Sequence, residues 1–194
     1  MPPKAKFTKQ QVIQAAVDLV REKGIDAVTA RELGSKLGSS ARPVFTAFKN
    51  MEEVISEVSR AARNCYNAYI AQGLKEKIAF KGVGRAYIRF AANEPNLFRM
   101  LFMEENNAAI SEILPVIDEN YSKILQSITS GYGVGNETAV KLYRHLWIYS
   151  HGIAVMLATH ACELSSEQID EMLTEVFIAL LKSHNCGGLY DLCR

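Results

Sequence analysis

The residues best suited to chemistry in this sequence lie in one short run, residues 39–49, which reads SSARPVFTAFK. The run combines two serines, a threonine, an arginine and a lysine, and it contains no carboxylate. Such side chains donate hydrogen bonds to phosphate oxygens and to the edges of bases, so the chemistry they favour is recognition of a nucleic acid. Apolar Val44 and Phe48 stand four residues apart and can anchor a short helix whose polar residues face outward.

Two helices are predicted to position this run. Thr8 is the predicted N-cap of the first, whose apolar stripe ends at Gly24. The second lies in TARELGSKLG, residues 29–38, where Thr29 and Glu32 have the spacing of a capping box. In such a box each side chain accepts a hydrogen bond from the other residue's backbone amide.

The turn that follows is predicted to be tight. Gly38 allows the left-handed conformation that ends a helix, and Ser39 or Ser40 is expected to cap the next one. Pro43 suits the first turn of that helix, whose positive N-terminal end could enter the major groove of DNA. Two short helices joined so closely cross steeply, as in a helix-turn-helix.

The rest of the chain is predicted to be helical. Asn50 is expected to cap a long fourth helix that runs to about Gly73. Further helices are predicted over about 76–93, from Pro95 onward, over 108–130 with a kink near Pro115, over 136–161, and over 166–184 with a capping box of Ser165 and Gln168. We therefore expect an all-α protein with a DNA-binding domain over residues 1–50 and a helical domain over 51–194.

Composition and charge narrow the classes of protein. The chain has 194 residues, 48% of them hydrophobic, and no apolar run near the ~18 residues of a membrane span, so we expect a cytoplasmic protein without a membrane partner. Residues 1–50 carry nine basic and four acidic residues, a balance of +5, and the remainder carries 13 and 17, a balance of −4. This asymmetry indicates a polyanion partner at one end of the chain.

Catalytic, cofactor and metal sites are not expected. Ser150 beside His151 lacks the Gly-x-Ser-x-Gly frame of a nucleophile elbow, and no paired acid and base stand out. The glycines of GYGVG, residues 131–135, follow no strand, which argues for a loop and against a phosphate cradle. Cys186 and Cys193 near His184 lack the paired spacing of a zinc site, so these cysteines are expected to be free thiols.

Residues 7–58 resemble the TetR family of bacterial transcriptional regulators. The matching features are Ala15 and Ala16, Gly24, and the runs TARELGSKLG, SSARPVFTAF and KNMEEV, all in family order and spacing. The resemblance implies DNA contacts from Thr29, Arg31, Ser39, Ser40, Ala41, Arg42, Pro43, Phe45, Thr46 and Lys49.

Three residues depart from the family pattern. Phe45, Ala47 and Met51 stand where the family usually has Tyr, His and Lys, which tend to contact phosphate. Fewer phosphate contacts imply a shallower dependence of DNA binding on salt.

Two later segments resemble one class of TetR C-terminal domain, which implies effector binding and dimerisation. They are RAYIRFAANEPNLFRMLF, residues 85–102, and the Trp147, His151 and Gly152 of WIYSHG. Candidate effector contacts, for which ordinary core packing is the alternative, are Phe98, Phe102, Met103, Trp147, His151 and Met156. For His151 a structural role with a protein partner is the favoured interpretation. Candidate dimer contacts are Leu157, Ile169, Leu173, Val176, Phe177 and Leu180.

The functional hypothesis is a homodimeric regulator, acting as a repressor, that binds a palindromic double-stranded DNA operator. A small apolar effector molecule would control it by preferring one of two conformations. The alternative hypothesis is a helical protein that binds or sequesters a small molecule and whose DNA-binding part has degenerated.

Overall fold

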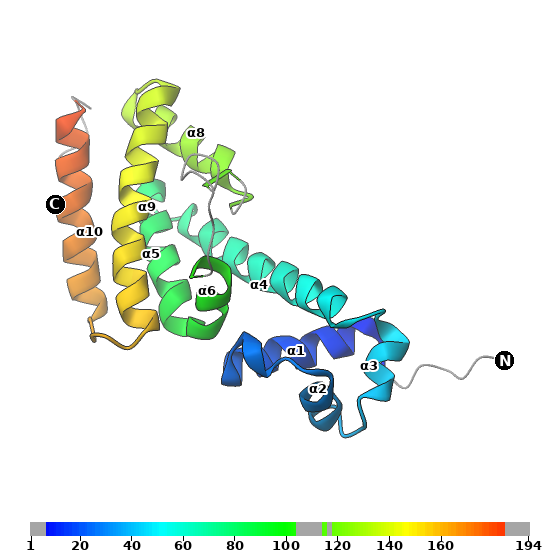
Figure 1. The fold of residues 1–194 in the computed structure, drawn as a ribbon. Coiled ribbons are helices and arrows are strands. Elements are labelled where there is room, and N and C mark those ends of the chain that lie inside the picture. The colour runs from blue at the N-terminus through cyan, green and yellow to red at the C-terminus, as the bar shows by residue number, and fades with distance from the viewer. Residues whose placement is uncertain (1–6, 104–113, 116–117, 185–194) are drawn as a thin grey trace. The chain divides into compact units, whose positions relative to one another are not determined.

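A computed structural model describes residues 7–103, 114–115 and 118–184, and every regular element in these ranges is a helix (Figure 1). The elements, in chain order, are α1 (Lys9–Lys23), η1 (Ile25–Ala27), α2 (Ala30–Lys36), α3 (Arg42–Ala47), α4 (Met51–Gly73), α5 (Ala79–Asn93), α6 (Pro95–Phe102), α8 (Tyr121–Tyr132), α9 (Asn136–Ala158) and α10 (Ser166–Ser183). Cys186 and Cys193 lie outside the described residues, as do residues 108–113 and 116–117 of the helix predicted over 108–130; α8 covers the last part of that range.

Contacts divide the chain into two units. The N-terminal unit comprises residues 1–65 and 94–104, and the C-terminal unit comprises residues 66–93 and 105–194. Helix α4 contributes residues to both units, and α6 belongs to the N-terminal unit although it follows α5 after a single residue. The expected domain boundary after residue 50 stays a prediction; by contacts, residues 51–65 and 94–104 group with α1–α3.

The N-terminal unit is built on α1, which contacts α2, α3 and α6. Thr8 caps α1 in a full capping box with Gln11, and Gly24 ends the helix, as predicted. The unit's core is apolar: its fully buried side chains include Val12, Ala16, Val20, Leu33, Val44, Val54 and Val58. Because they come from α1, α2, α3 and the first half of α4, one small core orients all four helices.

The turn between α2 and α3 depends on a close backbone approach. A Cβ on Gly34 would lie 2.6 Å from the backbone carbon and oxygen of Ser40, closer than real Cβ contacts come. Gly38 has the predicted left-handed conformation, with φ of +63°. Only a residue without a side chain allows α2 to lie this near the turn.

Two predictions of helix capping near this turn differ from the structure: the first is wrong in part, and the second is wrong. The Thr29 hydroxyl accepts the predicted hydrogen bond from the Glu32 amide, but the Glu32 carboxylate binds the Lys23 ammonium at 3.0 Å. The N-cap of α3 is Ala41, without a side-chain hydrogen bond, in place of Ser39 or Ser40. Pro43 in the first turn, which needs no amide partner there, helps to define this start.

A forked ion pair joins α6 to α1 within the N-terminal unit. The Arg21 guanidinium donates from two nitrogens to the two carboxylate oxygens of Glu94, at 2.9 and 2.8 Å. The side-chain amide of Asn96 also donates a hydrogen bond to the Arg21 backbone carbonyl at 2.9 Å. An ion pair with two parallel hydrogen bonds fixes the orientation of the two side chains as well as the distance between them.

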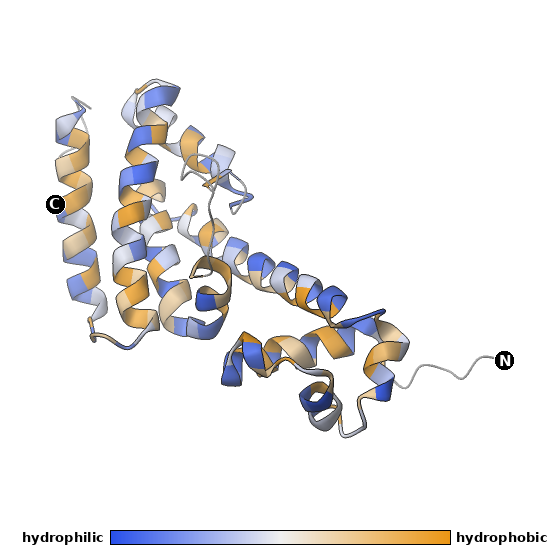
Figure 2. Cartoon of the chain, in the orientation of Figure 1, coloured by the Kyte–Doolittle hydropathy of each residue, from blue (hydrophilic) through white to orange (hydrophobic). Residues whose placement is uncertain are grey.

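The C-terminal unit packs α5 against α8, α9 and α10 (Figure 1). Hydrophobic residues recur along α5, α9 and α10 (Figure 2), and the buried ones include Phe80, Phe90, Tyr143, Ile153 and Phe177. The predicted ends of the last two helices are correct to within three residues, and the Ser165–Gln168 capping box is confirmed. No helix among the described residues is long and apolar enough to cross a membrane.

A buried carboxylate lies at the centre of a polar cluster in this unit. Asp118 accepts hydrogen bonds from the hydroxyls of Tyr66 at 3.2 Å and Tyr143 at 3.1 Å, and from the Asn120 amide. Burial raises the pKa of Asp118, while these hydrogen bonds oppose that shift. The tyrosines therefore stabilise a charge that has no cationic partner among the described residues.

The tight turn makes a testable prediction about stability. Gly34→Ala forces the Ser40 backbone to move and should lower the free energy of unfolding by about 1–3 kcal/mol, despite the better helix propensity of alanine. The matched control is Gly152→Ala, because Gly152 is also helical but has open space where a Cβ would be added. Urea unfolding should show a loss for the first variant and none for the second. Equal behaviour of the two would contradict the close approach.

Candidate nucleic-acid interface and effector site

Helix α3 presents one continuous exposed face. Arg42, Phe45 and Thr46 are exposed, and their spacing of three and four residues places them on a single side of the helix. Lys49, also exposed, follows the helix, which ends at Ala47 before the extended Phe48. Val44 and the cap residue Phe48 are buried, as predicted, and attach the helix to the unit's core. The packing that hides these two apolar residues therefore directs the exposed residues of α3 outward.

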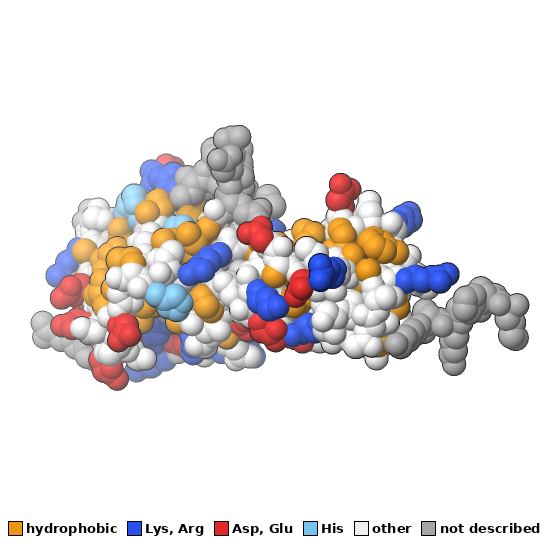
Figure 3. All heavy atoms as spheres, turned by 60° about the horizontal axis from the view of Figure 1, so that its bottom comes forward, with side chains coloured by type: hydrophobic (Ala, Val, Ile, Leu, Met, Phe, Trp, Pro, Cys, Tyr) orange, Lys and Arg blue, Asp and Glu red, His pale blue; other side chains and the backbone are white. Residues whose placement is uncertain are grey.

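The cations of this unit fall into two groups. Lys9, Arg21, Lys23 and Lys36 each form an ion pair, with Glu53, Glu94, Glu32 and Glu22 respectively. Within the described part of the first 50 residues, Arg31, Arg42 and Lys49 form no ion pair, although the Glu53 carboxylate lies near Lys49. Lys and Arg side chains stand beside hydrophobic ones on the surface of this unit (Figure 3). Unpaired positive charge attracts phosphate, and Arg42 lies on the exposed face of α3 while Lys49 follows the end of that helix.

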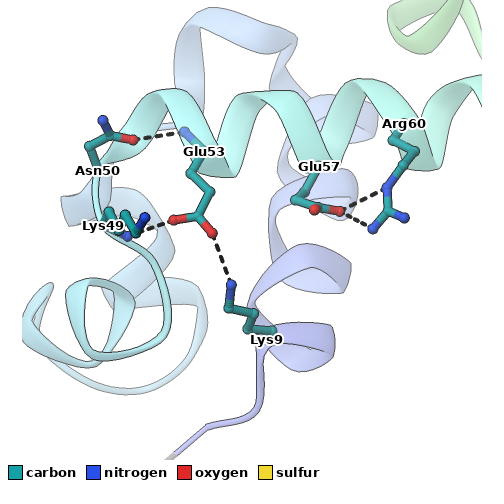
Figure 4. Close-up of polar contacts among 6 residues, drawn as sticks. All are labelled: Lys9, Lys49, Asn50, Glu53, Glu57 and Arg60. Carbon is teal, nitrogen blue, oxygen red and sulfur yellow. Dashed lines mark hydrogen bonds and ion pairs between the residues drawn. The ribbon is translucent and has the colours of Figure 1, made fainter.

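The start of α4 holds a carboxylate next to this face (Figure 4). Glu53 accepts hydrogen bonds from the Lys49 amide at 2.8 Å and from the Lys9 ammonium at 2.9 Å, while the Asn50 side chain caps the Glu53 amide. These interactions, with the Lys49 amide the main one, lower the pKa of Glu53, so it is ionised at neutral pH. Lys9 and Glu53 line a shallow hollow of about 270 Å³ together with Phe45 and Thr46.

Lys9 and Glu53 were not in the sequence-based list of site residues. The Asn50-x-x-Glu53 spacing, which is that of a capping box, could have indicated that Glu53 folds back towards α3. No pattern in the sequence around Lys9 predicts its contact with Glu53, because 44 residues separate the two.

The other predicted DNA contacts are close to α3 in the chain but differ in exposure. Thr29 and Ser40 are exposed, whereas Ser39, Ala41 and Pro43 are half-buried around the turn. Thr29 already uses its hydroxyl as the cap of α2. None of these contacts has been tested, and they stay predictions.

Trp147 and His151 form a stacked pair in the C-terminal unit. Their ring centroids are 4.9 Å apart with an interplanar angle of 14°, as expected for residues one helical turn apart on α9. His151 Nδ1 lies 2.8 Å from the Tyr87 hydroxyl on α5, and burial lowers the pKa of His151. The histidine therefore has a protein partner, in line with the structural interpretation of its role.

A small cavity lies beside this pair. It is lined by Tyr66, Val83, Gly84, Tyr87, Tyr143, Leu146, Trp147 and Ser150, and its volume of about 10 Å³ matches one water molecule. Ser150 is 1% exposed, and neither its hydroxyl nor the buried indole nitrogen of Trp147 has a hydrogen-bond partner among the residues that the structure describes. Two unmatched polar groups at an aromatic cavity can bind one acceptor atom.

The other candidate effector contacts are not gathered at this cavity. Phe98, Phe102 and Met103 belong to the N-terminal unit, where the Phe98 and Phe102 rings contact each other at 5.2 Å. Met156 is on α9 but is exposed and does not line the cavity. Sequence spacing alone did not separate these residues, because it does not show which helices pack together.

A second, open groove of about 990 Å³ runs between α5 and α10. Its floor is apolar, with Ile88, Ala92, Leu157, Leu164 and Ile169, and its rim is charged, with Arg85, Arg89, Glu167, Asp170, Glu171 and Glu175. Asp170 is held by Lys81 and Arg85 of α5, which lowers the pKa of its carboxyl. Sequence analysis did not find this groove, because it depends on how two distant helices pack.

The candidate dimer contacts fall into a buried group and a half-buried group. Leu173 and Phe177 are fully buried within the chain's own core and have no surface left for a partner. Leu157, Ile169, Val176 and Leu180 are only half-buried. On α9, Ile148 and Met156 expose 50% and 38% of their surface.

Comparisons with known proteins agree with these features. Residues 12–58 match the model of bacterial regulatory proteins of the tetR family, and residues 80–180, more than half of the chain, match the tetracyclin repressor-like C-terminal domain. The chain is also similar to YobS of Bacillus subtilis (strain 168), an uncharacterized HTH-type transcriptional regulator. The two are 19% identical over 175 residues, which cover 89% of this chain and 90% of that protein.

The two matches cover the helix-turn-helix and the helices of the C-terminal unit, in the order in which the structure has them. The chain therefore belongs to the TetR family of bacterial transcriptional regulators.

Proposed function

We propose that the protein is a homodimeric repressor that binds a palindromic DNA operator through α3 and releases it when a small molecule binds the C-terminal unit. The observation that carries the proposal is the exposed face of α3, where Arg42 forms no ion pair and lies beside Phe45 and Thr46, with the exposed Lys49 just after the helix. Arginine can donate two hydrogen bonds to guanine, and lysine pairs with phosphate. A short helix with an arginine on its exposed face and a lysine at its end is suited to the major groove.

Dimerisation through α9 and α10 is supported by apolar surface that the chain does not cover. Ile148 and Met156 on α9 and the half-buried Val176 and Leu180 on α10 would gain contacts from a second copy. A two-fold dimer would present two α3 helices, which requires half-sites about one DNA turn apart, ~34 Å, or a multiple of it.

Effector binding is supported by the cavity at Trp147. Its walls are mainly aromatic and apolar, and Ser150 and Trp147 each supply an unmatched hydrogen-bond donor. A small apolar molecule with one acceptor atom would satisfy both donors, provided that the side chains around the cavity move to admit it. Its preference for one conformation would then shift the equilibrium between DNA-binding and released states.

Selection of duplexes from a random DNA pool by the purified protein tests the proposal. We expect an enriched inverted repeat, bound by two chains, with an affinity that falls as salt increases. The number of chains bound is measured by sedimentation of the complex.

Weak retention without an enriched sequence would instead favour the small-molecule binding protein with a degenerate DNA-binding part. The decisive variant then restores the family residues, with Phe45→Tyr, Ala47→His and Met51→Lys combined. If this variant selects an operator and the natural protein does not, the DNA-binding part of the natural protein has degenerated.

Glu53 should weaken DNA binding in the natural protein. Glu53→Gln keeps an acceptor for the Lys49 amide but frees the Lys9 ammonium and removes a negative charge beside α3. We expect tighter operator binding and a salt slope steeper by about one counterion, measured by fluorescence anisotropy at several salt concentrations.

Glu57→Gln is the matched control. Glu57 lies one turn further along α4 and pairs with Arg60 (Figure 4), so its loss changes the net charge equally without freeing Lys9. If the two variants had the same affinity and the same salt slope, the local effect of Glu53 would be refuted.

Ser150 offers a test of the effector cavity that needs no ligand. Ser150→Ala removes an unmatched buried hydroxyl and should raise the free energy of unfolding by about 1 kcal/mol relative to Ser127→Ala. Ser127 is also helical, and its hydroxyl donates to the Ile124 carbonyl at 2.7 Å, so both variants gain the same helix propensity. Urea unfolding of both variants measures the difference. A loss at Ser150 at least as large as that at Ser127 would mean that the hydroxyl already has a partner, such as a bound water.

A further inference from the structure

Phe45 is an exposed aromatic side chain on a helix face that is otherwise polar. Half of its surface, 50%, is accessible, while the neighbouring apolar residues of the same helix are buried. No ring contact with another aromatic side chain involves Phe45 in the described part of the chain. The ring therefore contributes little to the core, which Val44 and Phe48 already supply.

The surroundings of Phe45 favour DNA over a protein as the molecule that covers it. Arg42 lies three residues before it and Lys49 four residues after it, and neither forms an ion pair among the described residues, although the Glu53 carboxylate lies near Lys49. A protein surface that buried the ring would also have to neutralise both cations. DNA supplies phosphates on both sides of a groove, and those can pair with both cations while the groove floor meets the ring.

The chemistry of phenylalanine limits what it can recognise in that groove. The ring has no hydrogen-bond donor or acceptor, so it gains nothing from a phosphate or from the polar edge of a base. The major groove displays one apolar group on its base edges, the C5-methyl group of thymine. A thymine methyl is therefore the natural contact for this side chain.

We propose that Phe45 determines operator specificity by packing on the methyl group of one thymine in each half-site. This inference rests on the proposed function, since it requires that α3 enters the major groove. It explains why an apolar ring stands among hydrogen-bonding side chains, and it assigns Phe45 a role in reading sequence that a phosphate contact would not have.

Uracil scanning of the selected operator tests this role. Uracil presents the same hydrogen-bonding groups as thymine but lacks the methyl group, so each thymine is replaced in turn, symmetrically in both half-sites. For the natural protein we expect one position at which uracil weakens binding about fourfold per half-site, the value of one buried methyl group. Affinity is measured by fluorescence anisotropy with ligand-free protein.

Three variants make the test specific. Phe45→Ala should bind the thymine and uracil duplexes equally at that position, whereas Phe45→Leu should retain part of the preference. The control Ser35→Ala, at an exposed residue of α2 that is not among the expected DNA contacts, should retain all of it. Far-ultraviolet circular dichroism and thermal unfolding establish that each variant is folded, which is expected because Phe45 is half exposed.

Several outcomes would overturn the inference. An operator bound without any uracil effect would refute methyl recognition while leaving the proposed function intact. A uracil effect that persists unchanged in Phe45→Ala would assign the methyl contact to another residue. Failure to select any operator would instead remove the proposed function, and this inference with it.

Discussion

The approach of Gly34 to the Ser40 backbone is the constraint on which the DNA-binding geometry depends. It allows α2 to lie against the turn, and the turn sets the direction in which α3 leaves it. Val44 and Phe48 then fix the rotation of α3 about its own axis, because both must reach the core. With direction and rotation set, Arg42, Phe45 and Thr46 face outward. Recognition here is a consequence of backbone packing as much as of side-chain chemistry.

The distribution of ion pairs gives the same surface its electrostatic character. Acidic residues pair with the cations that brace the N-terminal unit, such as Arg21 on α1 and Lys36 on α2, and leave Arg31, Arg42 and Lys49 without an ion pair among the described residues. Such exposed pairs contribute little to stability individually. They leave the unpaired cations on α2, on α3 and just after α3, in the part of the chain that we propose contacts DNA. Glu53 moderates that charge from the side of α4.

The sequence was a good guide to whatever depends on local pattern. Helical period and capping residues predicted the helix-turn-helix, the long α4 and the last two helices, and burial confirms the inward side of α3. Predictions were poorer for contacts between segments that are distant in the sequence. Glu32 binds Lys23 instead of completing its box, and the Ser150 cavity and the α5–α10 groove form only when separate helices pack. The proposed contacts with DNA and with a partner chain depend on molecules that the sequence does not contain.

The Arg21–Glu94 ion pair has a consequence for building hybrid regulators. The C-terminal family match begins at residue 80, so a chimera joined there would take Glu94 from the new C-terminal part and Arg21 from the old N-terminal one. Helix α6, however, packs with α1. A chimera joined at residue 80 would therefore take α1 and α6, which pack together, from different proteins. The better exchange carries α6 together with α1, so that the forked ion pair and the Asn96 hydrogen bond are transferred intact.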